Sequence, residues 1–126
     1  MSKAHVAELA VSDVQVQGGL AGISRIKAEL GTSGAVDNNT GTDPGWTLTK
    51  PSGTGLYRIT GPKSANFTVL DCRLIMATYA DRKVDVEEID SGAGTIDIRT
   101  SAAGSAANGT DGDLVSVVVL WKRYNV

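Results

Sequence analysis

Alternation of apolar and polar residues dominates the chain from residue 23 onward. Strand-like alternation recurs in residues 23–30, 46–50, 56–60, 83–89 and 95–100. Residues 114–121 (LVSVVVLW) carry the strongest strand pattern. Residues 67–80 are apolar on both faces, which is typical of a buried strand, and the charges of Asp71 and Arg73 indicate a bend or bulge there. In residues 83–89 the alternation slips by one residue at Glu88.

Turn residues separate these segments at intervals of about 10 residues, as they do in β-sandwiches and barrels. Proline and glycine between residues 51 and 55, and glycines between residues 90 and 94, supply the backbone angles of tight turns. The chain is therefore predicted to be all-β, with a jelly-roll-like antiparallel β-sandwich of about 7–8 strands over residues 23–126. Residues 1–22 lack a clear strand rhythm and are predicted to form an N-terminal arm.

Two long segments of small and polar residues interrupt the strand rhythm. They are residues 31–45 (GTSGAVDNNTGTDPG) and residues 101–112 (SAAGSAANGTDG). Loops of this length in a compact domain are usually binding surfaces or mobile tips.

Composition narrows the class of partner. The chain has 126 residues and a net charge of −2, which does not favour a nucleic-acid binder. No apolar run approaches the roughly 18–20 residues that cross a bilayer, so no membrane partner is expected.

The single cysteine, Cys72, cannot form an intramolecular disulfide, and no apolar segment typical of a secretory signal follows Lys3. Synthesis in a reducing compartment is therefore expected.

The residues do not predict an enzyme. The single histidine, His5, lies in the arm, where no rigid element would orient it as a base. Cys72 lies in an apolar strand, where cysteine behaves as a small hydrophobic residue. Glu87 and Glu88 face opposite ways on a regular strand, so only a bulge could bring them to one substrate. No catalytic residue and no cofactor are predicted.

Two oxygen-rich loops have residue types found in calcium sites. The first contains Asn108, Thr110, Asp111 and Asp113 but lacks the glutamate and the spacing of an EF-hand. The second contains residues 37–43, which include two aspartates and Asn39. Because turns need the same residue types, no metal site is predicted, and whether either loop binds calcium or sugar stays open.

The apolar positions exceed what the core of so small a domain requires, so some of them are predicted to contact a partner or a second subunit. The candidate interface residues are Val6, Leu9, Val11, Val14, Val16, Trp46, Leu70, Leu74, Val118 and Leu120. The alternative is that the second sheet and the arm cover both faces of these strands.

Four segments resemble small structural proteins of tailed bacteriophages. They are residues 53–60 (GTGLYRIT), 80–86 (ADRKVDV), 95–100 (TIDIRT) and 112–122 (GDLVSVVVLWK). Jelly-roll modules of that group contain a G-x-Y-x-I/V-T strand, a strand with Val-Asp-Val, and a final apolar strand after Gly-Asp. The resemblance covers about residues 46–122 and rests on strand and turn patterns.

The resemblance implies a capsid decoration or cement protein, which binds the outside of the phage head and stabilises the shell. Its partner would be the major capsid protein, and the protein would itself be a dimer or trimer. It would be made in the bacterial cytoplasm and reside on the capsid surface of the virion. The arm would lie along a neighbouring capsid subunit.

Two alternatives remain at this stage. The chain could be a tail- or fibre-associated module that binds a carbohydrate or a receptor through its long loops and Trp46. A minimal hydrolase is the least favoured, because no residue pair has the character of a nucleophile and its base.

Overall fold

The computed structural model describes residues 13–16, 19–77 and 81–124. The described residues form ten strands and one 3-10 turn, Thr32–Gly34. The strands are β1 (Asp13–Val16), β2 (Gly19–Leu30), β3 (Val36–Asn38), β4 (Thr47–Thr49), β5 (Leu56–Thr60), β6 (Ala65–Ile75), β7 (Arg82–Asp90), β8 (Thr95–Ala102), β9 (Ser105–Ala106) and β10 (Leu114–Tyr124).

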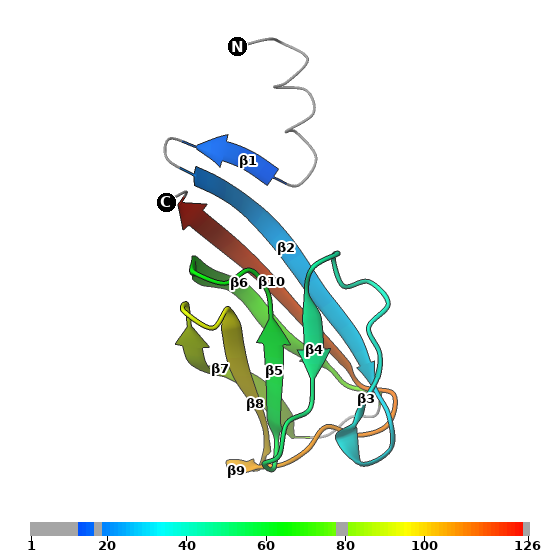
Figure 1. Cartoon of the computed structure of the whole chain (residues 1–126). Coiled ribbons are helices and arrows are strands. Elements are labelled where there is room, and N and C mark those ends of the chain that lie inside the picture. Colours follow the sequence, from blue (N-terminus) through cyan, green and yellow to red (C-terminus); the bar gives the residue numbers. More distant parts are fainter. Residues whose placement is uncertain (1–12, 17–18, 78–80, 125–126) are drawn as a thin grey trace.

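The strands form two antiparallel sheets that pack face to face (Figure 1). Sheet A has the order β1-β2-β10-β6, and β3 pairs with β2. Sheet B has the order β4-β5-β8-β7, and β9 pairs with β8. The chain passes between the sheets after β3, β5, β6 and β9. The prediction of an all-β, jelly-roll-like antiparallel sandwich is confirmed.

The strand count exceeds the predicted 7–8 because several strands are short. β3 and β9 have three and two residues, too few to show alternation in the sequence. β1 lies in the segment that was predicted as an arm, where it pairs with β2 through a register that joins Asp13 to Gly22.

The predicted arm therefore overlaps the sheet. Residues 13–16 and 19–22 form a hairpin, and β2 runs without interruption through the predicted domain boundary at residue 22. This hairpin and the end of β10 extend past the ends of β4 and β5 (Figure 1). Residues 1–12 lie outside the described part of the chain.

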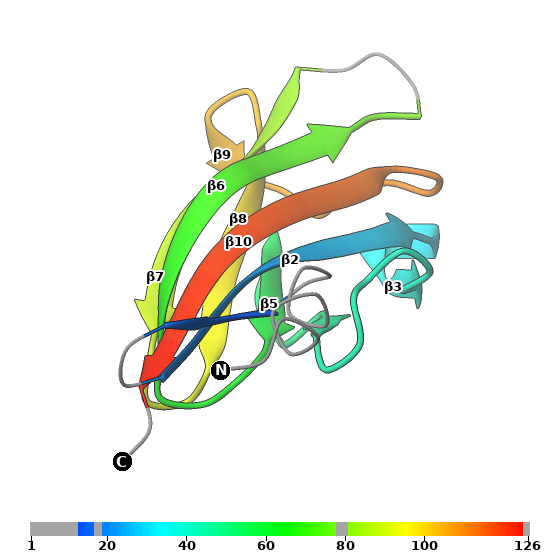
Figure 2. The ribbon, with the colours of Figure 1, turned by 90° about the horizontal axis from the view of Figure 1, so that it is seen from above.

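The core lies between the two sheets and consists of aliphatic residues with a few rings. The register of sheet A places Ile26, Val117 and Cys72 side by side on the inner face. Arg25, Val118 and Asp71 lie side by side on the opposite, outer face. Figure 2 shows how β2, β10 and β6 lie side by side and curve together.

Two β-bulges change which residues face the core. In β6, Val69 pairs with Val119 and Asp71 pairs with Val118, so Leu70 is the extra residue. In β7 the register shifts between Val86 and Glu88. Both irregularities were indicated by the sequence, near Asp71 and at Glu88. A bulge leaves one residue unpaired and reverses the alternation beyond it.

Candidate functional site

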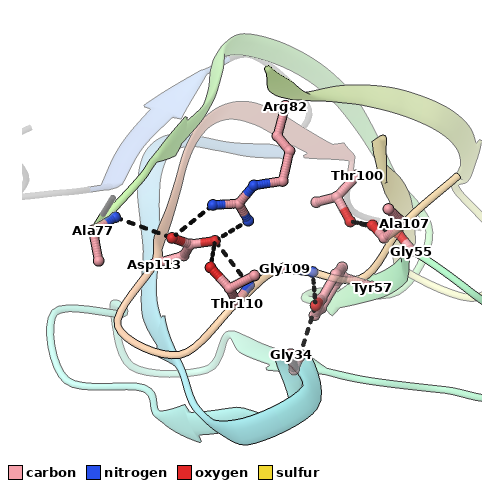
Figure 3. Close-up of polar contacts among 10 residues, drawn as sticks. All are labelled: Gly34, Gly55, Tyr57, Ala77, Arg82, Thr100, Ala107, Gly109, Thr110 and Asp113. Atoms are coloured by element: carbon pink, nitrogen blue, oxygen red, sulfur yellow. Dashed lines mark hydrogen bonds and ion pairs between the residues drawn. The ribbon is translucent and has the colours of Figure 1, made fainter. Parts of the chain in front are cut away.

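The most polar part of the interior surrounds Asp113, at the end of the sandwich where the chain enters β10 (Figure 3). Its carboxylate is 0% exposed and accepts hydrogen bonds from both terminal guanidinium nitrogens of Arg82, Nη1 and Nη2. It also accepts bonds from the backbone N–H and the hydroxyl of Thr110, at 2.8 and 3.1 Å. The backbone N–H of Ala77 donates a further bond at 3.0 Å. Three separate segments of the chain therefore meet at one carboxylate.

The surroundings of Asp113 keep it ionised. Burial by itself would raise the pKa of this carboxyl group, but the hydrogen bonds from Arg82, Thr110 and Ala77 outweigh burial and lower the pKa to about 2. The negative charge is fully paired with Arg82, whose side chain is also buried. An acid with this pKa and this many donors has no proton to exchange near neutral pH.

A second buried hydrogen-bond network centres on the hydroxyl of Tyr57. This hydroxyl donates to the carbonyl oxygen of Gly34 at 2.7 Å and accepts from the backbone N–H of Gly109 at 3.0 Å. Gly34 has a φ of 78°, and a Cβ there would lie 2.7 Å from the Tyr57 hydroxyl, so the approach requires glycine. Burial raises the pKa of Tyr57.

We name the residues of these two networks, Asp113, Arg82 and Tyr57, the polar latch. The latch joins the loop before β10 to the 3-10 turn after β2 and to the start of β7. Asn108 extends it, since its side-chain oxygen accepts from the Gly55 backbone N–H at 2.7 Å. No buried side-chain nitrogen or oxygen among the described residues lacks a partner.

The polar latch contains the central carboxylate of the first oxygen-rich loop. Asp113, its central carboxylate, is buried and paired with Arg82, and Thr110 donates to it. Across the described ranges, no three His, Cys, Asp or Glu side chains are grouped as a metal site would require. The polar residues of this loop build the end of the sandwich.

The second oxygen-rich loop is bound to the edge of β2. Asp43 accepts from the Arg25 backbone N–H at 2.9 Å, and its own N–H donates to the Arg25 carbonyl at 2.8 Å. The Thr42 hydroxyl makes the equivalent pair of bonds with the backbone of Lys27. The loop thus satisfies backbone groups of β2 where no described strand does so.

Trp46 is a core residue, which corrects its prediction as an interface or sugar-stacking residue. It is only 6% exposed and packs against Phe67, with 5.6 Å between the ring centroids. A Cβ at Gly61 would lie 2.5 Å from the Trp46 ring, so this glycine makes room for the indole. In the sequence Trp46 begins the alternating segment 46–50, in which it shares the apolar positions with Leu48, and in the structure both side chains are buried.

The outer face of sheet A carries exposed apolar side chains. Ile23 of β2 and Leu120 of β10 lie directly opposite each other in the ladder and are 55% and 38% exposed. Val118, two residues from Leu120 on the same face, is half-buried. We name Ile23, Val118 and Leu120 the apolar stripe. Its residues lie on the two long strands β2 and β10, which have 12 and 11 residues.

The bulge in β6 separates two residues that were predicted to share an interface. Leu70 is 52% exposed, so its side chain is accessible to a partner. Leu74 faces inward and packs against the core, which corrects its prediction as an interface residue. The extra residue at position 70 reverses the alternation, so the two leucines do not share a face.

The remaining predicted interface residues lie near or beyond the described ends. Val14 and Val16 belong to β1, opposite Ala21 and Gly19 of β2. The other three, Val6, Leu9 and Val11, lie outside the described residues, as does His5.

Cys72 and Glu87, two residues considered as possible catalytic groups, both interact with neighbouring side chains. Burial, together with Asp71 and Asp85, raises the pKa of the Cys72 thiol to about 11, so it stays protonated at neutral pH. Glu87, at the bulge of β7, forms an ion pair with Arg99 at 2.9 Å. This pair lines a shallow hollow on the outer side of β7 and β8.

Two residues were not predicted from the sequence, Arg82 of the polar latch and Ile23 of the apolar stripe. Arg82 lies 31 positions from Asp113, and no local spacing links the two residues. Ile23 did carry a signal, because it falls on the same side of the predicted strand as Lys27 and Glu29, which marks it as outward-facing.

Comparison of the chain with protein-family models, with curated proteins and with solved structures found no match. Among the described residues there is no helix with the length and apolar character to cross a membrane.

Proposed function

We propose that the chain is a structural virion protein, a capsid decoration or cement protein that binds the outer surface of a phage head and stabilises the shell. The observation that supports this proposal is the apolar stripe on the outer face of sheet A. An isoleucine and a leucine that lie side by side in water, 55% and 38% exposed, favour a surface that is covered by another protein. The choice of a phage head rests on the resemblance of residues 46–122 to phage structural proteins.

The stripe suits a binding role that involves no catalysis. Covering exposed apolar surface contributes roughly 25 cal/mol per Å², so a small stripe gives a modest affinity at each site. A shell presents the same site many times, and an oligomer of this chain that binds several sites at once gains avidity. Charged residues beside the stripe, such as Arg25 and Asp71, would set its orientation on the partner.

The alternative is a tail- or fibre-associated module that binds a carbohydrate or receptor. The structure does not favour it, because the aromatic residue expected to contact the sugar is buried. Trp46 packs in the core, so its ring is not available to stack on a sugar. Such a module would have to bind through polar loop residues alone, and Asn39, Thr42 and Asp43 already bond to neighbouring strands. We therefore place the decoration role first.

The experiment is to count the chain in purified virions of the phage that encodes it. Quantitative peptide mass spectrometry would give the number of copies relative to the most abundant shell protein. A ratio near one-to-one, or a simple fraction of it, supports the decoration role. A handful of copies per particle would favour the tail or fibre role, and absence from the particle would overturn both.

A further inference from the structure

One sheet edge in the described structure is long and nearly uncharged. β6 has eleven residues, and its one described strand partner is β10. Along those eleven residues the charged side chains are Asp71 and Arg73, and there is no lysine or proline. Free edges of this kind are open to pairing with another strand, and proteins usually protect them.

The other edges are protected by devices that β6 lacks. The loop at Thr42 and Asp43 bonds to the edge of β2, and β4 has only three residues. β7, the free edge of sheet B, carries five charged residues beyond Arg82 and a bulge near Glu87. The bulge at Leu70 interrupts β6 once, which leaves the segment from Asp71 to Ile75 regular.

Exposed apolar residues gather on the side of the sandwich where this edge lies. β6 and β7 contact each other at this side and follow one another along the chain. Leu70 of β6 and Val86 and Ile89 of β7 are all exposed there. They account for three of the six exposed large hydrophobic residues among those described. A partner seated on β6 would cover apolar surface as well as backbone.

The charge pattern of β6 indicates which partner fits. Asp71 and Arg73 lie on the same face, one on each side of Cys72, with 3.5 Å between their side chains. In an antiparallel pair of two β6 strands centred on Cys72, Asp71 of each copy is opposite Arg73 of the other. Two-fold symmetry forms this opposite-charge pair twice.

We propose that the chain forms a two-fold dimer in which β6 pairs antiparallel with β6 of a second copy, centred on Cys72. Sheet A then continues across the dimer, and the two apolar stripes lie on one continuous outer surface. This inference does not depend on what the stripe binds.

The first test is sedimentation equilibrium on the full chain with charge-reversed variants. The wild type is expected to be a dimer. Asp71→Arg or Arg73→Asp replaces two attractive pairs by two repulsive ones, so the dissociation constant should rise about tenfold or more. The double variant D71R/R73D restores opposite charges and should return the constant to within about threefold of the wild type.

The matched control is Arg58→Asp. Arg58 is a half-buried arginine whose ion-pair partner is Asp97 on the outer side of sheet B, so the control changes the net charge by the same amount as R73D does. Its dissociation constant should equal that of the wild type. A monomer at concentrations up to about 1 mM, a trimer, or a dimer unaffected by both reversals would overturn the proposal. Circular dichroism of each variant confirms that it is folded.

The second test is oxidative crosslinking, which reports the register. Residues opposite each other in antiparallel strands have Cα atoms about 4.5–5.5 Å apart, within the range that a disulfide spans. Oxidation of the wild type with copper phenanthroline should therefore link two copies through Cys72, and Cys72→Ser should prevent this link. A dimer that responds to the charge reversals but forms no such link would overturn the register centred on Cys72.

Discussion

At one end of the sandwich a carboxylate lies in the interior, whereas on the outer face of sheet A an isoleucine and a leucine lie in water. Asp113 is 0% exposed, yet Arg82, Thr110 and Ala77 satisfy it completely. Ile23 and Leu120 are exposed, and nothing among the described residues covers them. The buried polar groups have used their bonding capacity within the fold, so they stabilise it. The exposed apolar side chains are not covered by the described part of the fold, so they are available for a partner.

This contrast separates two residue sets that both look functional in the sequence. The loop of Asp111 and Asp113 resembles an ion site by composition, but its central carboxylate holds three segments of the chain together. The apolar stripe resembles ordinary strand residues, but it points away from the core. The first set should therefore affect stability, and the second should affect binding alone.

The largest expected effect is that of Asp113→Asn. The substitution leaves the Arg82 guanidinium buried without a counter-charge, which typically costs about 3–5 kcal/mol of the free energy of unfolding. Asp111→Asn, two residues earlier and exposed, should change it by less than about 0.5 kcal/mol. Urea unfolding followed by tryptophan fluorescence measures both. Equal stabilities of the two variants would contradict the structural role of the latch.

Acid should weaken the latch in a defined range of pH. The pKa of Asp113 is about 2 in the fold and near its ordinary value of 3.8 in the unfolded chain. Its stabilisation of about 2 kcal/mol is thus fully present above pH 4 and is lost as the pH falls toward 2. Urea unfolding at a series of pH values between 2 and 6 should show this loss. The same slope in Asp113→Asn would mean that another group causes it.

Removal of the Tyr57 hydroxyl should have a smaller effect. Tyr57→Phe leaves the Gly34 carbonyl and the Gly109 N–H buried without their partner, at a cost of about 1–3 kcal/mol. Thr49→Val provides the control, since the exposed Thr49 hydroxyl makes only a 3.4 Å bond. A Tyr57→Phe variant as stable as the wild type would show that water or a shift of the loop replaces the hydroxyl.

The smallest effect on stability is expected on the apolar stripe. Leu120→Glu places a charge on a side chain that is already exposed, so the free energy of unfolding should change by less than about 0.5 kcal/mol. Thermal unfolding followed by circular dichroism provides the measurement. A loss of several kcal/mol would mean that Leu120 packs within the fold, and the contrast with the latch would disappear.

The sequence predicted the architecture because alternation and turn residues are local signals. Both bulges were indicated, since a charge in an apolar run and a slip at Glu88 break the period of two. The long-range features could not be predicted in this way. Arg82 meets Asp113 only because the sheets bring residues 31 positions apart together. Trp46 was predicted as an interface residue because no local signal shows that its ring packs against Phe67, which lies 21 positions later.

The bulge in β6 places two predicted interface residues, Leu70 and Leu74, on opposite faces of sheet A. Leu70 and Leu74 share a face in a regular strand, and an extra residue in β6 places one outside and the other inside. Knowing that a bulge exists is therefore not enough, because the position of the unpaired residue decides the face of every residue beyond it.

The most direct test of the account is the binding of this chain to phage heads that lack it, with Leu120→Glu compared with Thr60→Glu. Both variants add a negative charge at an exposed strand residue, the first within the apolar stripe and the second on β5 of sheet B. Co-sedimentation should show that Leu120→Glu no longer binds, while Thr60→Glu binds as the wild type does. Undiminished binding of a folded Leu120→Glu variant would contradict the assignment of the apolar stripe as the docking surface.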